Sequence, residues 1–174
     1  MRKSVELVFA LKRKNKFGGF MDREQILKKY EPTRENLLYI LHDIQDSKDE
    51  KYLSEEDLVA VSKYLKISRS EVMGVATFYT MFSVKKRGHH IIRVCVSPPC
   101  QLMGSDTVFN YLRKTLGVKE GETTSDNMFT LESSSCLGVC AVAPAMMIDD
   151  QMFGNLTPEK IDEIITRYRE KKNG

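Results

Sequence analysis

Apolar residues in the first half of the chain recur at helical spacing. Within residues 34–46, four of them fall at i, i+3, i+4 and i+7: Leu37, Ile40, Leu41 and Ile44. Ser54 and Ser68 each stand three residues before an acidic residue, as in a capping box, and Ser68 with Glu71 matches that motif better. The helix after Ser68 is expected to use five apolar positions: Val72, Val75, Ala76, Tyr79 and Phe82. These patterns predict a small bundle of three or four short helices over residues 22–87.

After Gly88 the pattern changes to short apolar runs. Residues 89–96 are rich in β-branched side chains and predict a buried strand, while Ser97-Pro98-Pro99 is expected to be a loop. The later elements are expected as a helix at 101–116, a strand at 129–132, a hairpin around Asp149-Asp150 with strands at 145–148 and 151–153, and a last helix from Pro158 with Thr157 as N-cap. The order β-α-β-β-β-α is typical of a thioredoxin-like domain, here residues 88–174. The expected fold class is therefore α/β, with the helical bundle N-terminal to that domain.

The charge pattern restricts the partners of the chain. The formal net charge is only +3, and the basic stretch at residues 12–16 (KRKNK) is interpreted as a solvated part of a lead-in over residues 1–21. Without interleaved aromatic residues, a nucleic-acid-binding arm is the less favoured interpretation of that stretch. No apolar run approaches the ~20 residues that cross a bilayer, and residues 5–11 are too short for an export signal. We expect a cytoplasmic chain with no nucleic acid and no direct membrane insertion, soluble or peripheral through its complex.

The four cysteines form two close pairs. Four residues separate Cys95 from Cys100, three separate Cys136 from Cys140, and 35 lie between the pairs. Thiols of a chain without an export signal are expected to be reduced, so paired cysteines indicate metal ligation rather than disulfides. The first pair flanks the turn from the first strand into the next helix, and the second pair follows the next strand. In a β-α-β unit these loops lie at the same edge of the sheet, so we expect the four sulfurs to converge.

A [2Fe-2S] cluster fits this arrangement best. Such a cluster needs four soft anionic ligands, limited solvent and backbone N–H groups directed at the sulfurs. A helix N-terminus at Cys100 is expected to supply N–H groups, and Gly138 to let the second loop come close. Structural zinc remains an alternative, although its sites favour two-residue spacers, and a redox dithiol lacks its C-x-x-C motif. The sequence contains neither a G-x-G-x-x-G motif nor a P-loop motif, so it does not indicate a nucleotide site.

Three segments of the chain carry a family resemblance. They are GVATFYTMFSVKKRGHHIIRVC (74–95), GETTSDNMFTLESSSCLGVCAVAPAMMIDD (121–150) and LTPEKIDEII (156–165). From about residue 25 to 172 the chain resembles the E subunit of NADH-quinone oxidoreductase, a family that also supplies small subunits of NAD(P)H-linked hydrogenases and formate dehydrogenases. The C-L-G-x-C-x-x-A-P signature at Cys136 and Cys140 is the most specific part of the match.

The resemblance implies a thioredoxin-like [2Fe-2S] ferredoxin domain after a helical bundle. Its ligands would be Cys95, Cys100, Cys136 and Cys140, and the chain would be a redox subunit without an active site of its own. FMN and NAD(P)H would bind only the partner, a flavin-containing subunit, and further iron–sulfur subunits would belong to the same complex. The chain has Ser97-Pro98 where the family usually has Gly-Thr. The alternative function is a zinc-stapled protein-interaction module without a redox role.

Overall fold

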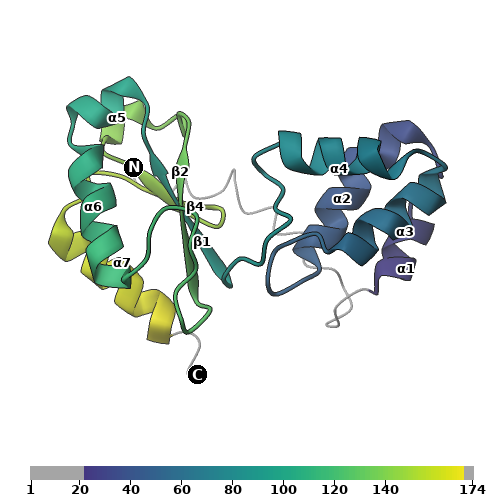
Figure 1. Ribbon diagram of the computed structural model, residues 1–174. Helices are drawn as coiled ribbons and strands as arrows, with labels where there is room; N and C mark the ends of the chain where they lie inside the picture. Colours follow the sequence, from purple (N-terminus) through teal and green to yellow (C-terminus); the bar gives the residue numbers. More distant parts are fainter. Residues whose placement is uncertain (1–21, 171–174) are drawn as a thin grey trace, which may run out of the picture.

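The computed structural model describes residues 22–170 in two parts, one helical and one built on a β-sheet (Figure 1). The expectations for residues 1–21, including the basic stretch, lie outside the described residues. The elements in chain order are α1 Arg23–Lys28, η1 Arg34–Asn36, α2 Leu37–Asp46, α3 Glu55–Leu65, α4 Arg69–Phe78, β1 His90–Cys95, α5 Pro98–Leu102, α6 Ser105–Leu116, β2 Phe129–Ser134, η2 Cys140–Val142, β3 Met146–Ile148, β4 Gln151–Phe153 and α7 Pro158–Glu170.

The helical part, α1 to α4, has its own apolar core. The four periodic residues of α2 are all buried in it, as their spacing predicts. Ser54 begins α3 with a complete capping box, since its hydroxyl accepts from the N–H of Asp57 and its own N–H donates to the Asp57 carboxylate. Ser68 makes only the first half of that motif with Glu71. The better sequence match is thus the less complete box.

The last predicted turn of α4 is wrong. The helix ends at Phe78, and Tyr79 is already extended. Phe82 still reaches the core, at 5% exposure, because the chain turns back through the hydrogen bond from the Phe82 N–H to the Tyr79 carbonyl. Phe78, the last residue of α4, is 77% exposed, and Tyr79 after it is 37% exposed.

The sheet confirms the thioredoxin-like arrangement. Its strand order is β2-β1-β3-β4, with β1 parallel to β2 and antiparallel to β3, and the β3–β4 hairpin turns at Asp149-Asp150. Both α6 and α7 pack on one face of the sheet, and the helical part lies on the other side (Figure 1). The last helix begins at Pro158 as predicted, with its apolar face buried.

The segment after β1 differs from its prediction. Pro98 and Pro99 are the first two residues of α5, with Ser97 as N-cap, rather than a loop. Proline suits this position because its fixed φ is helical and a first-turn N–H has no intrahelical partner. The single helix expected at 101–116 is also divided, since Gly104 takes a positive φ of 90° and α6 starts after it.

The connection between the two parts is held by hydrogen bonds that its backbone N–H groups donate. The Arg87 N–H donates to the Glu50 carbonyl at 2.7 Å, and the Gly88 N–H donates to the Thr130 hydroxyl at 2.6 Å. A Cβ atom on Gly88 would lie 2.9 Å from the Phe129 backbone, so only glycine fits this approach to β2. The predicted domain boundary at residues 87 and 88 falls here and stays a prediction.

Candidate metal centre

The fold brings the two cysteine pairs to one end of the sheet. Cys95 is the last residue of β1 and is in register with Ser134, the last residue of the parallel strand β2. Cys100 lies in α5, directly after β1, while Cys136 follows β2 and Cys140 begins η2. Because β1 and β2 are parallel, their carboxyl ends point to the same edge, and both cysteine loops start there.

The sulfurs lie as two neighbouring pairs. The Sγ atoms of Cys136 and Cys140 are 3.5 Å apart. The side chains of Cys95 and Cys100 interact with each other, which lowers the pKa of Cys95 and raises that of Cys100. Cys140 interacts electrostatically with both Cys95 and Cys100, which places the pairs side by side. Within residues 22–170, no three His, Cys, Asp or Glu side chains gather around one metal-ion position. The sulfurs are grouped two and two, not around a single point.

The two pairs differ in their access to solvent. Cys95 and Cys100 are buried, at 1% and 2% exposure, and pack with Ala143 and Ala145. Cys136 and Cys140 are exposed. One side of the site is therefore dry and the other opens to the surface.

Backbone N–H groups reach the sulfurs from the loops. The Gly138 N–H donates to Cys136 Sγ at 3.4 Å, and Gly138 has a positive φ of 79°. Burial raises the pKa of the Cys95 thiol, but hydrogen bonds from the N–H groups of Ser97 and Leu137 and from the Ser97 hydroxyl outweigh burial and lower that pKa. The thiolate of Cys95 is thus stabilised in place.

The thiols of Cys100 and Cys140 are held in the protonated form. Burial and the hydrogen bond with Cys95 raise the pKa of Cys100, although the Ala145 N–H opposes them. The hydrogen bond with Cys136 raises the pKa of Cys140. A metal that binds these sulfurs displaces the protons that they carry.

Comparison with known proteins decides the nature of the bound group. The thioredoxin-like [2Fe-2S] ferredoxin family matches residues 23–169. The chain belongs to this family. The family assignment confirms the predicted fold and the predicted [2Fe-2S] cluster.

Two relatives of the chain are named as E subunits of NADH-quinone oxidoreductase. The chain is 37% identical over 146 residues to the E subunit of NADH-quinone oxidoreductase from Rickettsia felis, covering 83% of this chain and 87% of that protein. It is 35% identical over 149 residues to the corresponding protein of Mycobacterium tuberculosis, and there spans 86% of this chain but 58% of that protein. These matches confirm the family resemblance noted in the sequence.

A solved structure supports the fold over most of the chain. An air-oxidised NAD+-reducing [NiFe]-hydrogenase superposes with a TM-score of 0.68 at 20% sequence identity. The match covers 87% of this chain and only 24% of that one, so the chain spans about a quarter of the hydrogenase chain.

The donor set fits the ferredoxin cluster. A [2Fe-2S] cluster takes two thiolates on each iron, and the structure offers four thiols in two pairs with N–H groups directed at the sulfurs. Leu137 and Ala145 were not foreseen as donors, because every residue except proline carries an N–H and no sequence signal marks them. The helix terminus expected to help Cys100 begins with Pro98 and Pro99, which have no N–H to donate.

The loop that follows Cys140 is hydrogen-bonded to the segment after β4. The Val142 carbonyl accepts from the Asn155 N–H at 2.6 Å, and the Pro144 carbonyl accepts from the Leu156 N–H at 3.3 Å. Gly154 lies so close that a Cβ atom there would meet the Val142 side chain at 2.3 Å. The segment after β4 therefore packs against the loop that directly follows Cys140.

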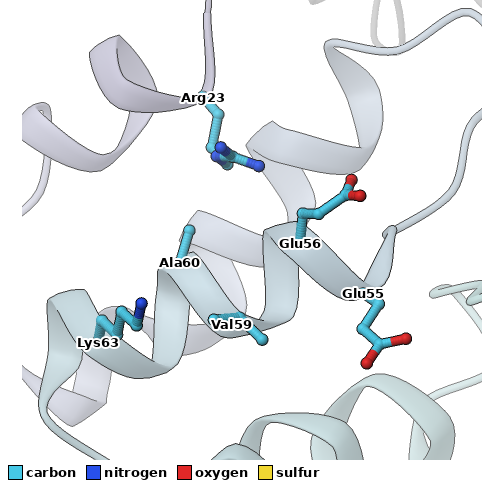
Figure 2. Close-up of a pocket in the computed structure, with 6 residues that line it drawn as sticks. All are labelled: Arg23, Glu55, Glu56, Val59, Ala60 and Lys63. Carbon is cyan, nitrogen blue, oxygen red and sulfur yellow. The ribbon is translucent and has the colours of Figure 1, made fainter.

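A pocket on the helical part is separate from the cysteines (Figure 2). It measures about 430 Å³ and is lined from α1 and α3 by Arg23, Glu55, Glu56, Val59, Ala60 and Lys63. Arg23 in its wall pairs with the buried Asp57 carboxylate at 3.4 Å, so its charge already has a partner. No cysteine contributes to this pocket.

Within the described residues, no helix is long and apolar enough to span a bilayer.

Proposed function

We propose that the chain carries electrons through one [2Fe-2S] cluster held by Cys95, Cys100, Cys136 and Cys140. The observation that supports this is the pairing of four thiols at the carboxyl ends of β1 and β2. Cys95 and Cys100 would bind one iron, and Cys136 and Cys140 the other. Such a cluster accepts and releases one electron at a time without forming or breaking a substrate bond.

The difference in exposure gives the two sides of the site different roles. The buried pair, packed with Ala143 and Ala145, keeps water from the inner side of the cluster. The exposed pair lies at the surface, where a partner can come close. Electrons would enter and leave on the side of Cys136 and Cys140.

The partner in this proposal is the flavin-containing subunit of an NAD(P)H-linked oxidoreductase complex. The relatives named as E subunits of NADH-quinone oxidoreductase support this placement. FMN and NAD(P)H would bind that partner, and further iron–sulfur subunits would receive the electrons. The chain would be a redox subunit without its own active site, peripheral to any membrane through its complex.

Metal analysis tests the cluster and its ligands. Purified protein should contain about two irons and two labile sulfides per chain and be red-brown. The Cys136→Ser variant should lose or strongly perturb the cluster, while Ser135→Ala, an exposed neighbour, should leave it intact. A colourless protein that contains zinc would instead support an interaction module without a redox role. An unchanged cluster in the Cys136→Ser variant would show that Cys136 is not a ligand.

An activity assay tests the division of labour. The isolated chain should neither bind FMN nor oxidise NADH, because its sequence has no dinucleotide or P-loop motif. The assay is NADH consumption with ferricyanide as acceptor, using protein free of flavoprotein. Turnover by the pure chain would mean that a nucleotide site exists in it.

A further inference from the structure

Three charged side chains meet on the sheet face opposite α6 and α7. On β2, the Glu132 carboxylate forms two ion pairs. Its Oε1 atom lies 2.7 Å from Arg87 Nε, and its Oε2 atom lies 3.2 Å from Nε of Arg93 on β1. The side chains of Arg87, Glu132 and Arg93 are 7%, 19% and 21% exposed. Two positive charges and one negative charge leave this ion cluster with a net charge of one positive unit.

The other contacts of Arg87 leave that charge in place. Its guanidinium donates to the carbonyl oxygens of Met81 at 3.2 Å and Thr80 at 3.3 Å, which are neutral acceptors. A buried arginine that binds neutral carbonyls keeps its full charge. The excess positive unit is therefore not cancelled by a second acid in these contacts.

The strands bring the ion cluster close to the cysteines. Arg93 and Glu132 are in register with each other, and two residues further along each strand Cys95 is in register with Ser134. Side chains two residues apart share one face of a strand and lie roughly 7 Å apart. Arg93 and Cys95 therefore stand next to each other on the same face of β1.

Few other charges compete near the cysteines. Residues 94–105 and 133–148, which hold all four cysteines, contain no Asp, Glu, Lys or Arg. Arg93 and Glu132 border these segments on one side, and Asp106 and Asp149 border them on the other. Asp106 is exposed, and Asp149 pairs with His90 at the far end of β1. Of the charged residues that border these segments, Arg93 and Glu132 are less exposed than Asp106 and Asp149, so their charges are screened less by solvent.

We propose that the net positive charge of the Arg87–Glu132–Arg93 ion cluster raises the reduction potential of the [2Fe-2S] cluster. This inference rests on the proposed function. One electron from an external reductant makes the iron–sulfur cluster and its thiolates more negative by one unit, with no bond formed. A nearby positive charge stabilises that reduced state, and low hydration strengthens the effect.

The test is a charge ladder in the full-length protein. Counting the three side chains, the net charge is one positive unit in the parent, zero in Arg93→Gln, two in Glu132→Gln and one in the double variant. Redox titration followed by electron paramagnetic resonance should give the lowest potential for Arg93→Gln and the highest for Glu132→Gln. The double variant and Arg93→Lys should stay near the parent.

A matched control separates local from general charge effects. Arg167 pairs with Glu163 on an exposed face of α7, so Arg167→Gln makes the same change in total charge far from the ion cluster. It should leave the potential unchanged. A shift as large as that of Arg93→Gln would overturn the inference.

Other outcomes are equally decisive. An unchanged potential in Arg93→Gln, or shifts of the same sign in Arg93→Gln and Glu132→Gln, would overturn the inference while the proposed function stands. A parent protein without a cluster signal would instead overturn the proposed function, and this inference with it.

Discussion

The Ser97 hydroxyl acts on the Cys95 thiol and does not cap helix α5. Its hydrogen bond to the Cys95 thiol contributes to lowering the pKa of that thiol. Donors to a sulfur favour the more negative, reduced cluster, so Ser97→Ala should lower the reduction potential. Redox titration measures this shift, and Ser97→Thr, which keeps a hydroxyl, is the control. A potential that stays constant or rises in Ser97→Ala would show that the hydroxyl does not tune the cluster.

Replacement by alanine should change the free energy of unfolding in opposite directions at Gly154 and Gly74. A Cβ atom on Gly154 would press into Val142, next to Cys140, so Gly154→Ala should cost about 1–3 kcal/mol and loosen the cluster. Gly74 is exposed inside α4 with nothing within 4 Å of a new Cβ, so Gly74→Ala should stabilise by about 0.5–1 kcal/mol. Urea unfolding and iron retention measure both. Equal effects of the two variants would contradict the packing at Val142.

At the level of elements, the buried carboxylate of Asp57 links α3 to its surroundings. Burial raises the pKa of Asp57, but hydrogen bonds from Lys48 and Ser54 outweigh burial and hold that pKa below its usual value. A lowered pKa gives stability that is complete above the usual value of about 3.9 and is lost as the pH falls through the lowered pKa. The helical part should therefore lose stability in acid below about pH 4.

The Asp57→Asn variant isolates this contribution. It should be less stable by about 1–3 kcal/mol at pH 7, because hydrogen bonds to the charged carboxylate are lost. Its unfolding free energy should also fall less steeply in acid than that of the parent. Asp49→Asn, at an exposed position, serves as control and should follow the parent curve. Parallel acid curves for Asp57→Asn and the parent would show that Asp57 does not carry the effect.

Elements with strong local signals were predictable from the sequence. The hairpin at Asp149-Asp150 and α7 from Pro158 were placed correctly because their turn and capping residues act locally. The start of α5 was missed, since two prolines suggest a loop although they suit a first helical turn. Phe82 lies after the end of α4 and reaches the helical core through a turn. Helical spacing of apolar residues predicted its burial but not this turn.

The candidate site was predictable in its residues and less so in its geometry. Spacing and signature singled out Cys95, Cys100, Cys136 and Cys140, which the fold brings together as two pairs. Their difference in exposure and their N–H donors depend on how the loops pack. Contacts between Arg87 and Glu132, 45 positions apart in the chain, likewise depend on the fold.

At the scale of the whole molecule, the exposed apolar residues at the end of α4 and just after it are the expected docking surface. Phe78 and Met81 are 77% and 45% exposed, and exposed apolar patches mark interaction sites on proteins. Phe78→Glu with Met81→Glu should abolish co-purification of the flavin-containing subunit and leave the iron content unchanged. Met152→Glu, a 42% exposed position on β4, is the control and should retain the partner. A double variant that binds the partner as tightly as the parent would place docking elsewhere.

Four paired thiols are proposed to hold one electron-carrying [2Fe-2S] cluster. The most direct test of this proposal is the electron paramagnetic resonance spectrum of the purified, full-length protein before and after reduction with dithionite. The oxidised protein should be silent, and the reduced protein should give a rhombic or axial signal of about one spin per chain. A protein that remains silent after reduction, or that contains zinc in place of iron, would show that the four cysteines do not hold a [2Fe-2S] cluster.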